Sequence, residues 1–396
     1  MAAAHPITGP GAAPRQPRVA VIGASLTGPA VALLLLQAGI EHVTVYEATP
    51  AGVTLGGGLI SLEHSSLGIL DRLGIDQPEY IHTPSETIWQ TPVDQRMLGT
   101  PVRRCYPGRC TTWTRLHEAL LRRLPTGMLH SRRRITGLDT RDGRPWLSFA
   151  DGCGSGADLV IFADGRASTG RRLLDPGRTL RYAGYIGHRG TTVGVEPGIT
   201  DFWRLEPGPG VQLNLGPVPG GLDWTFYLNG SARQYQDWFG SSWQRRLFAH
   251  AGQVSAAARD RVDAAAAHLL PARFARIVQA AADRAAFAVI DIDAPTRMVW
   301  PVGDGHAVLL GDALAPARAH TARGANNGLE QADALVTAVL QHVRYGADLT
   351  TALAGWQRRQ LPAAVAAVQR GPAIGARLGL GHRAAARPPV PAGTSR

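Results

Sequence analysis

The sequence contains no lysine and few cysteines, and each shortage limits what the protein can be. All 41 basic residues are arginine, against 30 acidic residues, so the formal net charge is +11. The arginines are scattered along an Ala- and Gly-rich chain, which indicates a compositional bias and no nucleic-acid site. Three cysteines in 396 residues exclude a disulfide framework and favour a reducing, cytoplasmic compartment.

Long apolar runs are also missing. The longest, residues 30–36, is far shorter than the ~20 residues of a membrane-spanning helix. Residues 1–16 lack the charged and apolar regions of a secretory signal, and we expect this segment and the tail at 382–396 to be disordered. With 44% hydrophobic and 18% charged residues, the chain has the composition of a globular protein with a large core.

The stretch 18–47 has the pattern of a βαβ unit with a glycine-rich first turn. Gly23 permits a tight turn, and Gly28 lets the following helix pack close to the strand. The free N–H groups of that helix suit a pyrophosphate, and Glu47 can accept hydrogen bonds from a ribose. Ser25 replaces the middle glycine of the dinucleotide fingerprint, and its hydroxyl can donate to a phosphate. The stretch therefore predicts a dinucleotide site.

Two later strand ends carry the same kind of signal. Asp164 and Gly165 close a buried strand, at the edge where ligands bind in open α/β sheets. Asp312 follows the strand 306–310, and a glycine loop that begins at Arg323 leads into a helix. An anion or a developing negative charge suits the N-terminus of that helix.

The segment 182–235 has the pattern of antiparallel strands. Alternation places Gln212 and Asn214 on one face of one strand, and Thr225 and Tyr227 on one face of another. A polar and aromatic face of this kind suits a lid over an aromatic ligand. Plain packing onto the rest of the protein explains each single residue equally well.

A turn at 106–109 predicts a hairpin that places Cys105 opposite Cys110. A C-x4-C spacing occurs in flavin disulfide reductases, but those enzymes need a second nucleotide fingerprint that this sequence lacks. We therefore expect two half-buried strand cysteines and no redox-active thiols.

Taken in order, the fingerprint, Asp164-Gly165 and Gly311-Asp312 resemble the single-component FAD-dependent aromatic hydroxylases of the p-hydroxybenzoate hydroxylase fold. The resemblance covers about residues 17–365. Within this family, three features resemble the 2,6-dihydroxypyridine 3-hydroxylase-like branch: Ser25, Tyr182-Ala-Gly-Tyr185 leading to Arg189-Gly190, and Arg318 with His320.

This resemblance implies an α/β fold with a Rossmann-like FAD-binding domain, an antiparallel-sheet substrate domain and C-terminal helices. The FAD-binding domain is expected to be discontinuous. The implied boundaries are 17–82, 101–181 and 286–345 for the FAD-binding domain, 83–100 and 182–285 for the substrate domain, and 346–381 for the C-terminal helices.

The resemblance also implies which residues hold FAD. The family's arginine before Leu116 is replaced by Trp113, so the contact there is assigned to either Trp113 or Arg115. The full implied set is Gly23, Ser25, Leu26 and Gly28 at the pyrophosphate, Glu47 and Ala48 at the ribose, Gly57 and Gly58 in the loop that lets the isoalloxazine swing, Trp113 or Arg115, Asp164, Asp312 at the ribityl chain, and Arg323, Gly324, Ala325 and Asn326 at the flavin N1–C2 edge.

The activity implied is hydroxylation of a phenolic or N-heteroaromatic small molecule. In this family NADPH or NADH reduces FAD, O2 adds at C4a, and the hydroperoxide gives one oxygen to the ring. Arg323 would stabilise the anionic reduced flavin. His188, His320 and Tyr227 are candidates for a proton relay to the substrate hydroxyl, and a structural role suits each of them equally. We expect a monomer or homodimer with no metal, nucleic-acid or membrane partner.

Other readings of the same fold stay open. Flavin-dependent tryptophan halogenases need a catalytic lysine, so the lysine-free sequence excludes them. The same flavin chemistry could instead serve epoxidation, Baeyer–Villiger insertion or oxidative decarboxylation, in secondary metabolism or elsewhere. A non-catalytic FAD-binding redox sensor is the alternative from another class.

Overall fold

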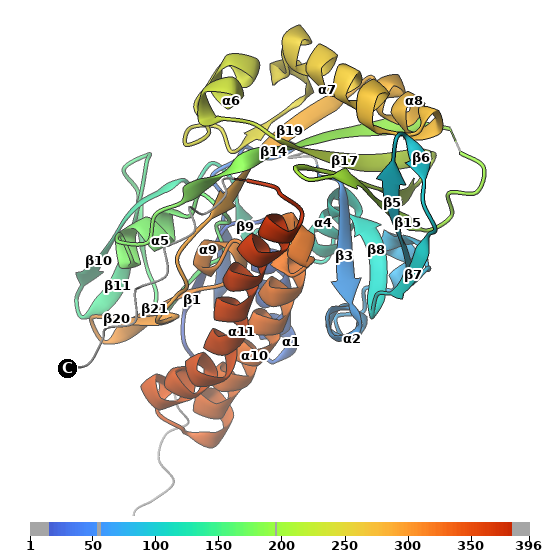
Figure 1. Cartoon of the computed structure of the whole chain (residues 1–396). Helices are drawn as coiled ribbons and strands as arrows, with labels where there is room; N and C mark the ends of the chain where they lie inside the picture. Colours follow the sequence, from blue (N-terminus) through green and yellow to red (C-terminus); the bar gives the residue numbers. More distant parts are fainter. Residues whose placement is uncertain (1–15, 54–56, 195, 382–396) are drawn as a thin grey trace, which may run out of the picture.

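The computed structural model describes residues 16–53, 57–194 and 196–381. Two large sheets, two small sheets and a pair of long helices make up the molecule (Figure 1). The predicted α/β fold, with parallel and antiparallel sheets and C-terminal helices, is confirmed. The segments 1–15 and 382–396, where we expected disorder, lie outside the described residues.

The predicted βαβ unit lies at the centre of a six-stranded sheet of order β20-β21-β13-β1-β2-β9. All neighbouring pairs are parallel except β20 with β21. Continuous apolar strands suit a parallel sheet because helices or loops cover both of its faces. The strands are β1 (Val19–Ile22), β2 (Val43–Tyr46), β9 (Leu129–His130), β13 (Leu159–Phe162), β20 (Val299–Val302) and β21 (Gly305–Leu309).

Helices α1, α10 and α11 pack beside this sheet, the last two side by side (Figure 1, orange and red). Gly328 lies so close to Thr27 that a Cβ on Gly328 would be 2.2 Å from the Thr27 hydroxyl oxygen. The helices other than those over the nine-stranded sheet are α1 (Thr27–Gln37), α2 (His64–Arg72), α3 (Gln77–Tyr80), α4 (Trp113–Leu121), α5 (Thr169–Leu174), α9 (Gly311–Leu314), the 3-10 turn η2 (Ala319–Thr321), α10 (Gly324–Tyr345) and α11 (Leu349–Arg377).

The second large sheet has nine strands in the order β18-β19-β14-β17-β16-β15-β5-β6, with β7 paired to β5. The antiparallel pattern predicted for 182–235 is confirmed by β14 to β17. The strands are β5 (Thr87–Asp94), β6 (Met97–Leu98), β7 (Val102–Cys105), β14 (Arg181–Val193), β15 (Phe202–Gly208), β16 (Val211–Val218), β17 (Gly221–Asn229), β18 (Phe248–Ala249) and β19 (Arg284–Asp291).

The two faces of the nine-stranded sheet differ. Trp224 and Phe226 pack in one apolar cluster with helices on the outer face, which lies at the top of Figure 1. Gln212 and Tyr227 lie directly opposite each other on the other face, called the inner face. The outer face is covered by α6 (Ala232–Phe239), the 3-10 turn η1 (Ala251–Gln253), α7 (Ala256–Leu269) and α8 (Ala272–Ala280).

The predicted hairpin at 106–109 is wrong. Strand β7 pairs with β5, whereas β8 (Gly108–Thr112) pairs with β3 (Leu59–Glu63) and β4 (Ile81–Thr83) in a separate sheet. Cys105 is exposed, Cys110 is half-buried, and all three cysteines are free. The local turn signal was real, but distant strands decide which partner each flanking strand takes.

The second small sheet is antiparallel and consists of β10 (Ile135–Arg141), β11 (Arg144–Phe149) and β12 (Gly154–Gly156). Across the described ranges, every helix is too short or too polar to cross a bilayer.

Candidate functional site

The glycine turn after β1 requires its glycines. Gly23 has a φ of +102°, and a Cβ there would lie 2.6 Å from the Ala163 carbonyl oxygen. A Cβ on Gly28 would lie 1.8 Å from the Gly23 carbonyl oxygen. Leu26 precedes α1 without a side-chain cap, and Ser25 is half-buried beside it. The first N–H groups of α1 are therefore available to a pyrophosphate.

Glu47 lies beside this turn at the end of β2. Its carboxylate accepts hydrogen bonds from the backbone N–H groups of Ala24 at 2.8 Å and Thr49 at 2.7 Å. An ionised carboxylate has about four acceptor positions, so two remain for the hydroxyls of a ribose. Ala48 follows directly and is half-buried.

Helix α4 brings two rings to the same turn. Trp113 stacks on His117 with ring centroids 4.4 Å apart, and His117 Nε2 lies 2.7 Å from the Ala24 carbonyl oxygen. Gly57 packs on Trp113, where a Cβ would lie 2.4 Å from the Trp113 Cβ. Arg115 is half-buried and contributes its backbone N–H to the helix cap. His117 was not predicted from the sequence, although its spacing of four residues from Trp113 places both rings on one face of a helix.

Asp312 has a carboxylate oxygen that nothing in the described part of the chain satisfies. Its Oδ2 accepts a hydrogen bond from Arg166 Nε at 3.2 Å, while Oδ1 is buried without a partner. Buried polar atoms are nearly always hydrogen-bonded, so Oδ1 indicates a ligand hydroxyl or a water molecule. The role of Asp312 at a ribityl chain stays a prediction. Arg166 had no signal in the sequence beyond following Gly165.

The carboxylate of Asp164 takes its hydrogen bonds from other residues of the chain. Its carboxylate accepts hydrogen bonds from Ser168 Oγ at 2.5 Å and from the backbone N–H groups of Thr169 at 2.6 Å and Gly170 at 3.2 Å. These donors lie at the start of α5, whose N-cap is Ser168. A cofactor contact at this position would therefore come from the backbone and not from the carboxylate.

The N-terminus of α10 offers backbone donors close to β3. Arg323 is the N-cap residue of α10, and its side chain accepts no hydrogen bond from the first turn of the helix. The N–H groups of Gly324, Ala325 and Asn326 therefore have no acceptor among the described residues. The Asn326 side chain fixes this end in place: its Oδ1 accepts from the Glu63 N–H at 2.8 Å. These donors fit an anionic ligand edge.

Arg323 itself has its charge compensated. Its Nη1 lies 2.6 Å from a Glu63 carboxylate oxygen, and its Nη2 pairs with Glu330. Nε and Nη2 also donate to Asn327 Oδ1 at 3.0 and 2.8 Å. In this structure Arg323 joins β3 to α10. Its role at a flavin stays a prediction.

Another ion pair ties the glycine loop to the inner face. Arg189 Nη2 lies 3.0 Å from Asp223 Oδ2, and Asp223 Oδ1 accepts from the Leu59 N–H at 3.2 Å. A Cβ on Gly58 would fall 0.9 Å from Arg189 Nη2, so glycine lets the loop approach the sheet.

His320 and Tyr227 meet on the inner face, with ring centroids 4.3 Å apart. His320 Nδ1 lies 3.0 Å from Gln212 Oε1, and His320 Nε2 is buried without a partner in the described ranges. Burial, reinforced by Arg204 and other cations, lowers the pKa of His320 to about 3. Burial raises the pKa of Tyr227 to about 12. Both side chains are therefore neutral at physiological pH.

Two more unpartnered atoms lie on the same face. Arg204 on β15 and Asn214 on β16 are directly opposite each other, and Arg204 Nε and Asn214 Oδ1 are both buried without a hydrogen bond to any described residue. The prediction that Gln212 and Asn214 share a polar face is confirmed. Arg204 was missed, because one arginine among 41 basic residues has no signal of its own.

His188 lies on the other face, so its predicted place in a relay with His320 and Tyr227 is wrong. Its ring packs against Trp238 and Phe239, with centroids 6.1 Å apart in each case, and lines a separate small hollow with Arg189 and Arg284. The register of β14 shifts between residues 182 and 186, so alternation counted from the start of the strand does not assign the face.

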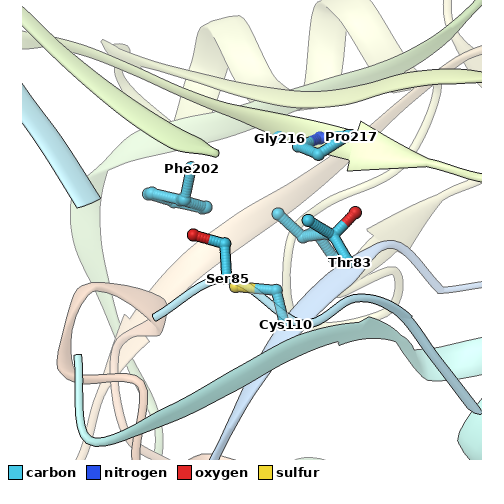
Figure 2. Close-up of a pocket in the computed structure, with 7 residues that line it drawn as sticks. Thr83, Ser85, Cys110, Phe202, Gly216 and Pro217 are labelled. Carbon is cyan, nitrogen blue, oxygen red and sulfur yellow. The ribbon is translucent and has the colours of Figure 1, made fainter. Parts of the chain in front are cut away.

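A small hollow lies between the β3-β8-β4 sheet and the nine-stranded sheet. Figure 2 shows Phe202 and Gly216 on one side and Thr83, Ser85 and Cys110 on the other. Cys110 is hydrogen-bonded to Ser61 at 3.4 Å, and burial raises the pKa of its thiol. The hollow is lined largely by apolar atoms next to Leu59, at the end of the glycine loop.

Two curated proteins align over most of the chain. The 6-hydroxynicotinate 3-monooxygenase of Bordetella bronchiseptica is 30% identical over 345 residues, which cover 82% of this chain and 83% of that protein. The 3-amino-4-hydroxybenzoate 2-monooxygenase of Streptomyces cremeus is 30% identical over 340 residues, which cover 81% of this chain and 78% of that protein. No family model matches the sequence.

The fold has a solved counterpart in 2,6-dihydroxypyridine-3-hydroxylase from Arthrobacter nicotinovorans. That structure superposes with a TM-score of 0.79 and 24% sequence identity, over 95% of this chain and 96% of the other. At this identity the likeness concerns the fold.

Proposed function

The chain belongs to the FAD-dependent aromatic hydroxylases, and from this membership we propose which substrate it takes and which residues handle it. The protein is an FAD-dependent monooxygenase that uses NAD(P)H and O2 to hydroxylate an aromatic or heteroaromatic small molecule.

The residues present fit FAD. The glycine turn and the free N–H groups of α1 would hold the pyrophosphate, and Glu47 the adenosine ribose. Asp312, with its buried unpartnered Oδ1, would accept a ribityl hydroxyl, and the open N-terminus of α10 would face the flavin N1–C2 edge. Bound FAD supplies the redox chemistry, which is hydride uptake from NAD(P)H and activation of O2.

One observation carries the substrate assignment: Arg204 Nε, Asn214 Oδ1 and His320 Nε2 are all buried, all unpartnered within the described residues, and all on the inner face. Arg204 offers a charged donor, Asn214 an amide oxygen that accepts, and His320 an imidazole nitrogen. Together these three groups suit a small ring with several polar substituents. The relatives' names specify 6-hydroxynicotinate and 3-amino-4-hydroxybenzoate, which both carry a hydroxyl and a carboxylate.

We therefore propose a hydroxylated aromatic or N-heteroaromatic acid as substrate. Its anionic group would be bound by Arg204, since guanidinium groups suit carboxylates. Its ring hydroxyl would donate to His320 Nε2, with Tyr227 packed beside it. A hydroxyl oxygen held in this way makes the ring more electron-rich, which favours oxygen transfer to carbon. The polar groups of the inner face thus orient the ring, and the apolar residues around them exclude water.

The test begins with FAD-loaded protein and a panel of hydroxybenzoates, aminohydroxybenzoates and hydroxypyridine carboxylates. The proposal predicts that one class stimulates NAD(P)H oxidation and yields a product that has gained one oxygen atom from ¹⁸O₂. A lactone, an epoxide or a decarboxylated product would assign the flavin to the alternative oxygen chemistries. FAD binding without any stimulated oxidation across the panel would favour the redox sensor.

We propose that residues 83–100 and 182–285 form the substrate domain and that the other described segments up to 345 bind FAD, followed by C-terminal helices. The three free cysteines support a reducing, cytoplasmic location. A monomer or a homodimer is proposed, and light scattering of the purified protein distinguishes the two.

A further inference from the structure

Gln212 lies between a carboxylate and His320. It is 1% exposed, its Nε2 lies 3.2 Å from Glu206 Oε1, and its Oε1 lies 3.0 Å from His320 Nδ1. Gln90 Nε2 lies 3.2 Å from both oxygens of the same carboxylate. A single chain of hydrogen bonds therefore joins strands β5, β15 and β16 to the 3-10 turn η2, which carries His320.

The carboxylate decides the orientation of the Gln212 amide. An ionised carboxylate can only accept hydrogen bonds, so the NH2 group of Gln212 faces Glu206 and its carbonyl oxygen faces His320. Asn214 Nδ2 donates to the same carbonyl oxygen at 3.4 Å, which supports this orientation. Since a carbonyl oxygen cannot donate, His320 Nδ1 carries the proton. Nε2 is then left with its lone pair, buried and without a partner in the described ranges.

We propose that Glu206 and Gln212 are positioning residues that hold His320 as the Nδ1–H tautomer and present the Nε2 lone pair to the substrate hydroxyl. This assignment rests on the proposed function, because it needs a hydroxylated ring on the inner face. The second hydrogen bond of an imidazole decides which nitrogen is free to act, as in other sites where histidine works. The step is a hydrogen bond from the hydroxyl to Nε2 and requires no other reactant.

The surroundings explain why the orienting group is an amide. Arg204, Arg318 and Arg377 face His320 and add to the effect of burial in keeping the imidazole neutral. Glutamate in place of Gln212 would add a negative charge at hydrogen-bond distance and favour the imidazolium, whose Nε2 donates and no longer accepts. Other groups around the ring are Tyr185 and Tyr227, which pack on it, and Asp291, which binds Arg318 through both oxygens at 2.6 and 2.5 Å.

The tautomer can be read directly from long-range ¹H–¹⁵N correlation spectra of FAD-loaded protein labelled with ¹⁵N-histidine. Of the 13 histidines, His320 is the one whose signals vanish in His320→Ala. We expect a protonated Nδ1 and an unprotonated Nε2 between about pH 5 and 9, because the pKa of His320 is lowered to about 3. Gln212→Leu should give a mixture of tautomers, and Gln212→Glu should raise the pKa of His320 toward neutrality.

Gln90→Leu is the matched control, since Gln90 binds the same carboxylate but does not touch His320. It should leave the tautomer unchanged, and the other histidine signals serve as an internal control in every variant. A wild-type protein with Nε2 protonated, or a Gln212→Leu variant that keeps the single Nδ1–H tautomer, would overturn the proposal.

Activity gives a second readout once a substrate is found. Gln212→Leu should lower kcat about tenfold, the usual effect of one lost hydrogen bond, with a smaller change in KM. Gln212→Glu should add a limb to the pH profile of kcat that wild type lacks. The tautomer is measured without substrate, so its failure is distinct from a failure to find turnover, which would concern the proposed function alone.

Discussion

Two buried histidines lie on opposite faces of the same sheet, and comparing them separates burial from function. His188 is 3% exposed and His320 is 8% exposed, each has an unpartnered Nε2 in the described ranges, and burial lowers the pKa of each to about 3. The His188 ring makes no hydrogen bond to any described residue and is packed among aromatic side chains. His320 is held through Nδ1 by Gln212.

The two histidines differ in the residues around them and not in the burial or the pKa of the imidazole. A perturbed pKa marks both residues equally, so on that ground both would be candidates for a functional site. Both rings have a cation nearby, Arg284 for His188 and Arg204 for His320. Only the inner face adds a side chain that is hydrogen-bonded to the imidazole, Gln212. Groups that orient a residue are therefore a better guide to function here than the pKa shift itself.

Removing His320 should have the largest effect. His320→Ala is expected to lower kcat/KM by about 10²- to 10⁴-fold, the usual range for a lost acid–base group, while the protein still binds FAD. Steady-state NAD(P)H oxidation with product analysis measures the loss, and the visible flavin spectrum checks the loading. Retention of near wild-type kcat/KM would remove His320 from the mechanism.

Two arginines extend the comparison. Arg204→Leu on the inner face should raise KM for an acidic substrate by about 10- to 100-fold, since it removes a charged hydrogen-bond donor. Arg284→Leu on the outer face should leave KM unchanged and destabilise the protein by about 2 kcal/mol. Arg284 is 5% exposed and pairs with Asp263 at 2.8 Å.

Arg204→Lys sharpens this prediction, because it retains the charge and loses the Nε donor. KM should fall between those of wild type and Arg204→Leu. Steady-state kinetics and urea unfolding of the same preparations give both quantities. A raised KM in Arg284→Leu would show that the two faces are not separate.

Acid should affect both histidines alike. Below about pH 6.5 the unfolded chain binds a proton at each ring, whereas the folded protein does not until about pH 3, so stability falls as the pH is lowered through this window. Each histidine should contribute a loss of about 2 kcal/mol between pH 6.5 and 5. Urea unfolding at the two pH values measures the loss, which should shrink by one histidine's share in His188→Leu.

Replacing His188 should have the smallest effect on activity. His188→Leu removes a buried, unpartnered nitrogen and keeps similar volume, so stability at pH 7 should change by less than about 1 kcal/mol. Turnover should change by less than about twofold. Loss of turnover with intact FAD binding would place His188 in the mechanism and contradict the separation of the faces.

The positions of several candidate cofactor residues follow from local patterns. The turn at Gly23, the acid at Glu47 and the strand end at Asp312 each depend on a few neighbouring residues, and the structure brings them to one edge of the six-stranded sheet. Alternation likewise placed Gln212 with Asn214, and Thr225 with Tyr227, because β16 and β17 are regular along their pairing.

The failures share a cause in long-range pairing. The partners of β7 and β8 are strands that local turn chemistry does not specify. His188 lies opposite Phe226 on β17, and so on the face away from His320, which only the strand pairing shows. The ion-pair partner of Arg323, Glu63, lies 260 residues earlier in the chain, while the role of Arg323 at a flavin stays a prediction. Arg204 and Gln212 acquire meaning only when β15, β16 and the loop of His320 are side by side.

The most direct test is a crystal structure of the FAD-loaded protein with a substrate that it turns over. The account predicts a ring on the inner face, with a hydroxyl oxygen at hydrogen-bond distance from His320 Nε2 and the acidic group at Arg204. A ring bound elsewhere, for example in the hollow beside Cys110 and Phe202, with no contact to His320 or Arg204, would contradict it.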